Sequence, residues 1–169
     1  SGRLAAGAEV AQASFQGATP LWIASARGYM SVVSMLLAAG AAVDCAEERV
    51  ITPLCAASHQ GHASVVSTLL AAGAAVDQAA LSGATPLWVA SGEGHASVVS
   101  VLLAAGAAPD CAVDRTTALD SACNRGHASI VSMLLAAGAT VDCNDPVTGT
   151  TPLFGACQSG DLEIVQVLS

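Results

Sequence analysis

Residues 85–110 have the sequence TPLWVASGEGHASVVSVLLAAGAAPD, and the chain contains five versions of this stretch. Close copies begin at Thr19 and Thr52, and weaker copies begin at Thr117 and Thr151. The five starts are 33, 33, 32 and 34 residues apart. A fixed period of this size is typical of proteins built by stacking small, similar units. The repeat therefore predicts the fold class before any other feature is considered.

Each unit carries signals for two short helices. In the third unit, Thr85 predicts a helix N-cap, and Pro86 fits the first helical position, where no amide donor is needed. Gly94 predicts the end of this helix through the left-handed conformation. A second helix is expected over residues 96–105, where valines and leucines recur on one helical face. A unit this small cannot cover its own apolar face, so it must stack on a neighbour.

The recurring elements are Thr-Pro-Leu, then Gly-His, then Leu-Leu, then Gly-Ala. This pattern resembles the ankyrin repeat family over nearly the whole chain, from Leu4 to Leu168. The resemblance implies an all-α fold, an ankyrin-repeat solenoid of stacked helix-turn-helix units with β-hairpin-like finger loops. It also implies a concave surface for protein partners on a scaffold that is not itself catalytic.

The repeats predict one elongated domain over residues 1–169. We expect a partial repeat at 1–11, repeats at 12–44, 45–77, 78–110 and 111–142, and a truncated repeat at 143–169. Residues 4–10 match residues 37–43, and residue 169 falls within a second helix, so we expect a piece of a longer array. Apolar faces are then uncovered at both ends, which predicts fraying there or end-to-end self-association of copies.

Charge and hydropathy exclude several classes of function. The net charge is −8, from 13 acidic residues against five arginines and no lysine. Nucleic-acid binding normally requires a basic patch or stripe, so we predict no nucleic-acid partner. No apolar run approaches the roughly 18 residues of a membrane span, and no secretion signal precedes the repeats, so we predict no membrane insertion. Four aspartates that follow Gly-Ala-x-x are expected to accept backbone amides as each finger begins: Asp44, Asp77, Asp110 and Asp142.

The six cysteines could form disulfides or bind metal. Equivalent positions of stacked helices lie roughly 8–10 Å apart, whereas a disulfide requires Cα atoms within about 7 Å. We therefore expect free thiols and an intracellular, cytoplasmic protein. Cys55, His59 and His62 form a C-x3-H-x2-H cluster, but a zinc site requires a fourth ligand, and the metal-free interpretation is favoured. We predict no metal and no cofactor.

No nucleophile elbow, phosphate-binding loop or carboxylate pair is present, so we predict no catalytic residue and no enzyme. The recurring histidines after the inter-helix glycine, His62, His95 and His127, indicate a structural role.

Two features of the first helices have alternative interpretations. Trp22 and Trp88 are either aromatic hot spots or packing residues between units, and packing is favoured because tryptophan is seldom left wholly exposed. Asp120, together with Ala118 in place of proline, makes the fourth unit the least regular. This predicts either a locally weaker unit or one shaped by a partner.

The fingers differ between units while the helical framework is constant, as in binding surfaces built on rigid scaffolds. By the resemblance, the contact surface consists of finger residues and the exposed end of each first helix. Carried over by position, the partner-binding residues are Phe15, Gln16, Arg27, Glu48, Arg49, Ile51, His59, Gln60, Leu81, Ser82, Glu93, Arg115, Asn124, Arg125, Val147, Thr148 and Gln158.

Four of the five arginines fall on this surface, and a guanidinium group is suited to carboxylates. We therefore expect a protein or peptide segment with acidic and apolar groups, although these arginines could instead serve only solubility. The leading hypothesis is a protein–protein interaction module. Two alternatives remain open: a structural spacer segment of a larger ankyrin-containing protein, and an engineered or self-associating repeat scaffold.

Overall fold

A computed structural model describes residues 18–44, 51–111, 116–141 and 151–169. In this part of the chain, ten helices form five consecutive pairs. The first helices of the pairs are α1 (Pro20–Ala26), α3 (Pro53–His59), α5 (Pro86–Gly92), α7 (Ala118–Asn124) and α9 (Pro152–Ser159). The second helices are α2 (Met30–Ala38), α4 (Ala63–Ala71), α6 (Ala96–Ala104), α8 (Ala128–Ala136) and α10 (Leu162–Leu168).

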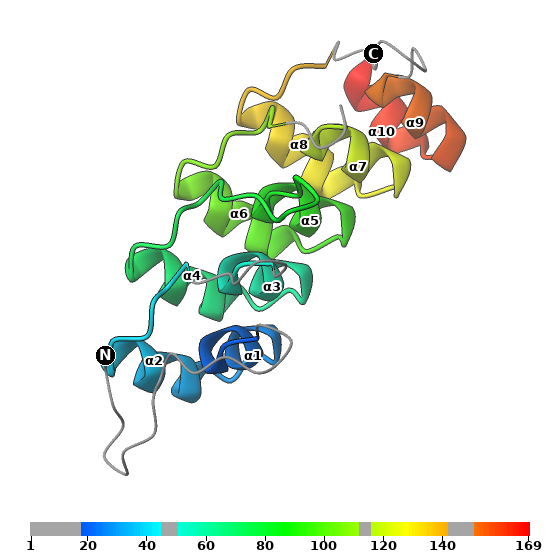
Figure 1. The fold of residues 1–169 in the computed structure, drawn as a ribbon. Helices are drawn as coiled ribbons and strands as arrows, with labels where there is room; N and C mark the ends of the chain where they lie inside the picture. The colour runs from blue at the N-terminus through cyan, green and yellow to red at the C-terminus, as the bar shows by residue number, and fades with distance from the viewer. Residues whose placement is uncertain (1–17, 45–50, 112–115, 142–150) are drawn as a thin grey trace.

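The pairs stack in chain order. Each first helix packs against the first helix of the next pair, and each second helix packs against the next second helix. The result is two rows of helices side by side, with α1 and α2 at one end of the stack and α9 and α10 at the other (Figure 1). The predicted all-α array of stacked helix pairs is therefore confirmed.

The first helices begin with a cap supplied by their own unit. Thr85 has extended backbone angles, and its hydroxyl accepts the amide of Trp88 at 3.2 Å. Threonine caps the other four first helices in the same way, and proline follows it in all but α7. The side chain satisfies one of the amides that a helix start leaves unpaired, as the sequence predicts.

The fourth unit replaces the missing proline with a capping box. The Asp120 carboxylate accepts the Thr117 amide at 2.9 Å, while the Thr117 hydroxyl accepts the Asp120 amide at 3.2 Å. Two amides at the start of α7 are therefore satisfied reciprocally. Of the two interpretations of this irregular unit, a locally weaker unit is the less favoured at its helix start, because this carboxylate stabilises the start of α7.

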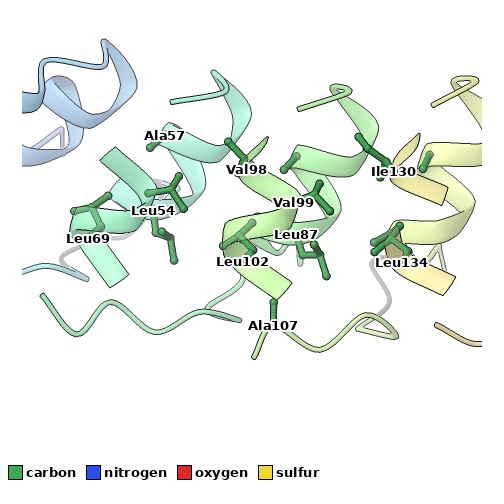
Figure 2. Close-up of a cluster of buried hydrophobic side chains, with 14 of the residues drawn as sticks. Leu54, Ala57, Leu69, Leu87, Val98, Val99, Leu102, Ala107, Ile130 and Leu134 are labelled. Atoms are coloured by element: carbon green, nitrogen blue, oxygen red, sulfur yellow. The ribbon is translucent and has the colours of Figure 1, made fainter. Parts of the chain in front are cut away.

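The core is one continuous band between the two rows of helices. Leu54 and Leu87 of first helices and Leu69 and Leu102 of second helices are at most 1% exposed and belong to the same cluster. Figure 2 shows this cluster running without interruption from α3 and α4 to α8. Each unit thus completes the core of its neighbour, as expected for a repeat array.

The backbone of the third finger, at residues 80–84, forms a tight turn. The Ala80 amide donates to the Ala84 carbonyl at 2.9 Å, and the Gly83 amide donates to the Ala80 carbonyl at 2.8 Å. Gly83 has a φ of 82°, a conformation that glycine adopts without the penalty of a side chain. Leu81 and Ser82 are thereby presented at the exposed tip of the finger.

Candidate functional site

The predicted contact residues that the structure describes all lie on the surface. Exposed are Arg27, Ile51, His59, Gln60, Leu81, Ser82, Glu93, Asn124, Arg125 and Gln158. The other seven, Phe15, Gln16, Glu48, Arg49, Arg115, Val147 and Thr148, lie outside the described residues.

Seven of the exposed residues form a set that we name the first-helix row. They end or directly follow the first helices, one or two from each: Arg27, His59, Gln60, Glu93, Asn124, Arg125 and Gln158. Because consecutive first helices pack side by side, this set crosses all five units. The row is polar throughout, and its residue types change from one unit to the next.

Glu93 lies near polar side chains of both neighbouring units in this row. Its Oε1 lies 3.0 Å from Nη1 of Arg125 in the next unit and 3.9 Å from Nε2 of His59 in the preceding unit. The Nδ1 of His59 in turn accepts the Gln60 side-chain amide at 3.0 Å. Glu93 is thus hydrogen-bonded to the following unit, while His59 of the preceding unit lies nearby but beyond hydrogen-bond distance.

A glycine of α5 gives Ser121 of the next unit room to approach. A Cβ built on Gly92 would lie 3.8 Å from the Arg125 guanidinium carbon and 2.5 Å from the Ser121 hydroxyl. Glycine at this position of α5 therefore permits the α7 side chains to approach closely. The sequence predicts that the arginines bind acidic groups of a partner. For Arg125 this prediction is modified, because Glu93 of the same chain already neutralises part of its charge.

The recurring histidines connect units rather than perform chemistry. His95 Nε2 donates to the His59 carbonyl at 2.9 Å, and His127 Nε2 donates to the Gly92 carbonyl at 3.0 Å. Each ring also lies against the inter-helix glycine of the preceding unit: a Cβ on Gly61 would approach the His95 ring to 2.7 Å. The structural role predicted for these histidines is confirmed.

The recurring aspartates also bridge units, in a way the sequence did not predict. The Asp44 carboxylate accepts the Ala75 amide at 3.1 Å, and Asp77 accepts the Ala108 amide at 3.2 Å. Asp110 accepts both the amide and the hydroxyl of Thr140, at 2.9 and 2.6 Å. The expected local turn role was therefore incomplete, because these hydrogen bonds reach 30 or 31 residues ahead into the next unit. Asp142 lies outside the described residues.

The comparison with known families agrees with this geometry. A family model for ankyrin repeats, spanning three copies, matches residues 3–80, 21–113, 54–145 and 105–169. The chain belongs to the ankyrin repeat family. Among curated proteins, none matches this chain. Ankyrin repeats are in general protein–protein interaction modules, and proteins built from them are typically not enzymes.

Trp88 packs between ankyrin units. Its ring lies against a small cluster of Cys55, Ala84 and Val89, of which Cys55 belongs to the preceding unit. The tryptophan is half-buried rather than fully exposed. This arrangement agrees with the packing interpretation rather than with an exposed hot spot.

The four described cysteines are free thiols in two environments. Cys55 and Cys123 are buried on first helices, whereas Cys157 is exposed and Cys111 is half-buried. Burial raises the pKa of Cys55 to about 12. The pKa of Cys123 is also raised to about 12, mainly by burial and to a lesser extent by the nearby Asp120 carboxylate. Both buried thiols are therefore protonated at neutral pH and poorly suited to act as nucleophiles or metal ligands.

Two further features concern metal binding and membrane insertion. Within residues 18–44, 51–111, 116–141 and 151–169, no three His, Cys, Asp or Glu side chains are grouped so as to hold a metal ion. In the C-x3-H-x2-H cluster, the Cys55 thiol faces the Ala84 carbonyl while His59 is exposed. None of the helices in the described part of the chain has the length and apolar character needed to cross a membrane.

Proposed function

We propose that this ankyrin array binds a segment of a partner protein along the first-helix row and the fingers beside it. The observation that carries the proposal is the contrast in variability between exposed positions. The first-helix row has a different residue in nearly every unit, whereas one exposed outer position of the second helices is serine in α2, α4, α6 and α8 and changes only in α10: Ser34, Ser67, Ser100, Ser132 and Gln166. A surface that differs from unit to unit can distinguish one side chain of a partner from another.

The described part of this surface offers both polar and apolar contacts. Leu81 is 74% exposed and Ile51 is 41% exposed, so each presents a large apolar side chain to solvent beside the row. Arg27 carries a positive charge with no ion-pair partner among the described residues. A partner segment that places a carboxylate near Arg27 and apolar side chains over Ile51 and Leu81 would complement all three.

The connection through Glu93 supports the row as a preorganised surface. Arg125 donates one hydrogen bond from Nη1 to Glu93, and its side chain remains 52% exposed. Holding a long side chain in place before binding lowers the entropy that association must otherwise cost. We therefore place the strongest contacts of the middle units at Arg125, with Glu93 as the residue that orients it.

The proposal is tested by affinity capture with matched variants. The immobilised chain is compared with Arg27→Ala/Arg125→Ala and with Ser67→Ala/Ser100→Ala, and each captured protein is then titrated against all three. If both arginines are hot spots, the arginine variant should lose about 2–4 kcal/mol of binding free energy, or roughly 30-fold to 1,000-fold in affinity. The serine variant should bind as the unmodified chain does.

Equal binding by the two double variants would contradict the proposed surface. If no protein is captured specifically by any of the three, the spacer interpretation replaces the interaction module.

A further inference from the structure

One residue from each of four consecutive units lies at the same place in the first-helix row. Arg27, Gln60, Glu93 and Arg125 are the C-cap residues of α1, α3, α5 and α7, and all four are exposed. We name this set the cap column. Consecutive first helices pack side by side (Figure 1), so its members follow one another at the spacing of packed helices, about 8–10 Å.

The charges of the cap column have a fixed order. The two arginines, Arg27 and Arg125, stand at its ends, three unit intervals or about 24–30 Å apart. Glu93 stands one unit before Arg125 and is the only acidic residue of the column. A segment that lies along the column therefore meets positive charge at both ends and negative charge at one place between them.

The spacing of the cap column matches one backbone conformation in particular. A polyproline II segment has three residues per turn and rises about 3.1 Å per residue, so residues three apart share a face at about 9.3 Å. Three such turns, or about nine residues, cover about 28 Å, which is the distance between the arginines. In a β-strand, residues three apart face opposite sides. An α-helix rises about 1.5 Å per residue and needs roughly 16–20 residues for the same distance.

The carboxamide side chains of the row favour a segment whose backbone is unpaired. Gln60 of the cap column and Asn124 and Gln158 beside it are all exposed. A carboxamide both donates and accepts hydrogen bonds, so it can pair with a peptide group. The peptide groups of a polyproline II segment make no internal hydrogen bonds, whereas those of an α-helix bond to each other. The row therefore suits a polyproline II segment better than a helix.

We propose that the partner segment binds the cap column in the polyproline II conformation, with acidic residues about nine positions apart on Arg27 and Arg125. This inference rests on the proposed function, because it names the kind of segment that the first-helix row binds. Every third residue of the segment contacts one unit. The residue opposite Glu93, three positions from the acid on Arg125, is neutral or basic, because a third acid there would face a like charge.

A displayed library of random peptides tests the spacing. Peptides of about 24 residues are long enough to reach both arginines as a polyproline II segment or as an α-helix. The library is selected on the unmodified chain and counter-selected on Arg27→Ala/Arg125→Ala. The selected peptides should share two acidic residues about nine positions apart. Acidic residues roughly 16–20 positions apart, with apolar residues at helical spacing, would overturn the polyproline II segment.

Conformationally restrained versions of a selected peptide test the backbone. Proline at positions between the two acids should keep or raise the affinity, because proline favours polyproline II and lowers the cost of ordering the segment. A lactam between residues four apart fixes a helix and should lower the affinity about tenfold or more, since the acids no longer reach both arginines. Fluorescence anisotropy measures both, and the opposite order of affinities overturns the proposal. Ser67→Ala/Ser100→Ala is the matched control and should bind every peptide as the unmodified chain does.

A double-mutant cycle assigns each acid to its arginine and separates this inference from the proposed function. Changing one acid to its amide together with Arg27→Ala should cost no more affinity than either change alone, and the other acid should behave in this way with Arg125→Ala. If affinity capture yields an arginine-dependent protein but the library yields no arginine-dependent peptide, the polyproline II segment is overturned and the surface stands. If neither a protein nor a peptide depends on the arginines, the proposed surface fails and this inference fails with it.

Discussion

The first helices α3 and α5 have seven residues, six of them buried, whereas the second helices α4 and α6 have nine residues, three of them buried. The two kinds of helix also differ in how they begin and in what they expose. Each first helix begins at a threonine of its own unit and ends in polar residues that change along the chain. The second helices α4 and α6 begin at histidines that make no side-chain cap and instead lie against the preceding unit. Their outer faces repeat the same serines.

This difference separates two tasks within one small unit. The second helices supply a contact that recurs between units, the ring that lies against the glycine of the preceding unit. The first helices pack against one another, and α1, α3, α5 and α7 bury their leucines in the shared core, while their exposed C-terminal ends vary. Variation is therefore concentrated in the first-helix row and the fingers, where a partner would read it.

The largest expected effect tests whether the two rows share one core. Leu87→Ala in α5 and Leu102→Ala in α6 should each lower the free energy of unfolding by about 2–5 kcal/mol, because both side chains are almost fully buried. Urea denaturation followed by circular dichroism measures the loss, with exposed Leu81→Ala as the control. If only one of the two core variants is destabilised, the rows do not depend on a common core.

A pH experiment tests the first helices specifically, because both buried thiols in the described part of the chain lie on first helices. Cys55 and Cys123 have a pKa of about 12 in the fold, whereas an unfolded cysteine titrates near about pH 8.5. Their contribution to stability is complete below pH 8.5. It is lost as the pH rises toward 12, by up to about 1.4 kcal/mol per pH unit for each thiol, since only the unfolded chain releases protons there.

Stability curves of the unmodified chain between pH 8 and pH 11 measure this loss. Cys55→Ala and Cys123→Ala should each flatten the decline, and exposed Cys157→Ala should not. The chain has no lysine, which removes one class of side chain that would otherwise titrate near this window. An unchanged slope in both buried-thiol variants would contradict the assigned pKa values.

A smaller effect is expected at the helix starts. Thr85→Ala removes the hydroxyl that accepts the Trp88 amide, and should cost about 1 kcal/mol of unfolding free energy. Thr85→Ser keeps a hydroxyl at the N-cap and should restore most of the loss. Equal destabilisation by alanine and serine would show that the methyl group, rather than the cap, matters at this position.

The smallest stability effect is expected within the first-helix row. Glu93→Gln removes the ion pair with Arg125, which is exposed to solvent on both sides and should contribute only about 0.2–1 kcal/mol. The melting temperature should therefore change little, while Arg125 loses its orienting partner. A loss as large as that of the leucine variants would mean that the row holds the fold together and is not primarily a recognition surface.

Features with local causes were predictable from the sequence. The period, the threonine caps and the exposed ends of the first helices all follow from residue order within one unit. The capping box at Thr117 and Asp120 was missed although its signal is local: a threonine three residues before a carboxylate.

Contacts between units were not predictable in the same way. The bonds from Asp44 to Ala75 and from Asp77 to Ala108 depend on the register with which one unit stacks on the next. The close approach of Ser121 to Gly92 and the pairing of Glu93 with Arg125 also join neighbouring units, and no spacing within a single unit indicates them. Such contacts exist only once one unit is stacked on the next, so the sequence of a single unit does not indicate them.

The most direct test of the proposed surface is amide hydrogen exchange of the whole chain with and without a partner obtained by affinity capture. The account predicts slower exchange on binding at the C-terminal ends of α3, α5 and α7 and in the finger at residues 78–84, with α4, α6 and α8 unchanged. Slower exchange centred on α4, α6 and α8, with the ends of the first helices unaffected, would contradict it.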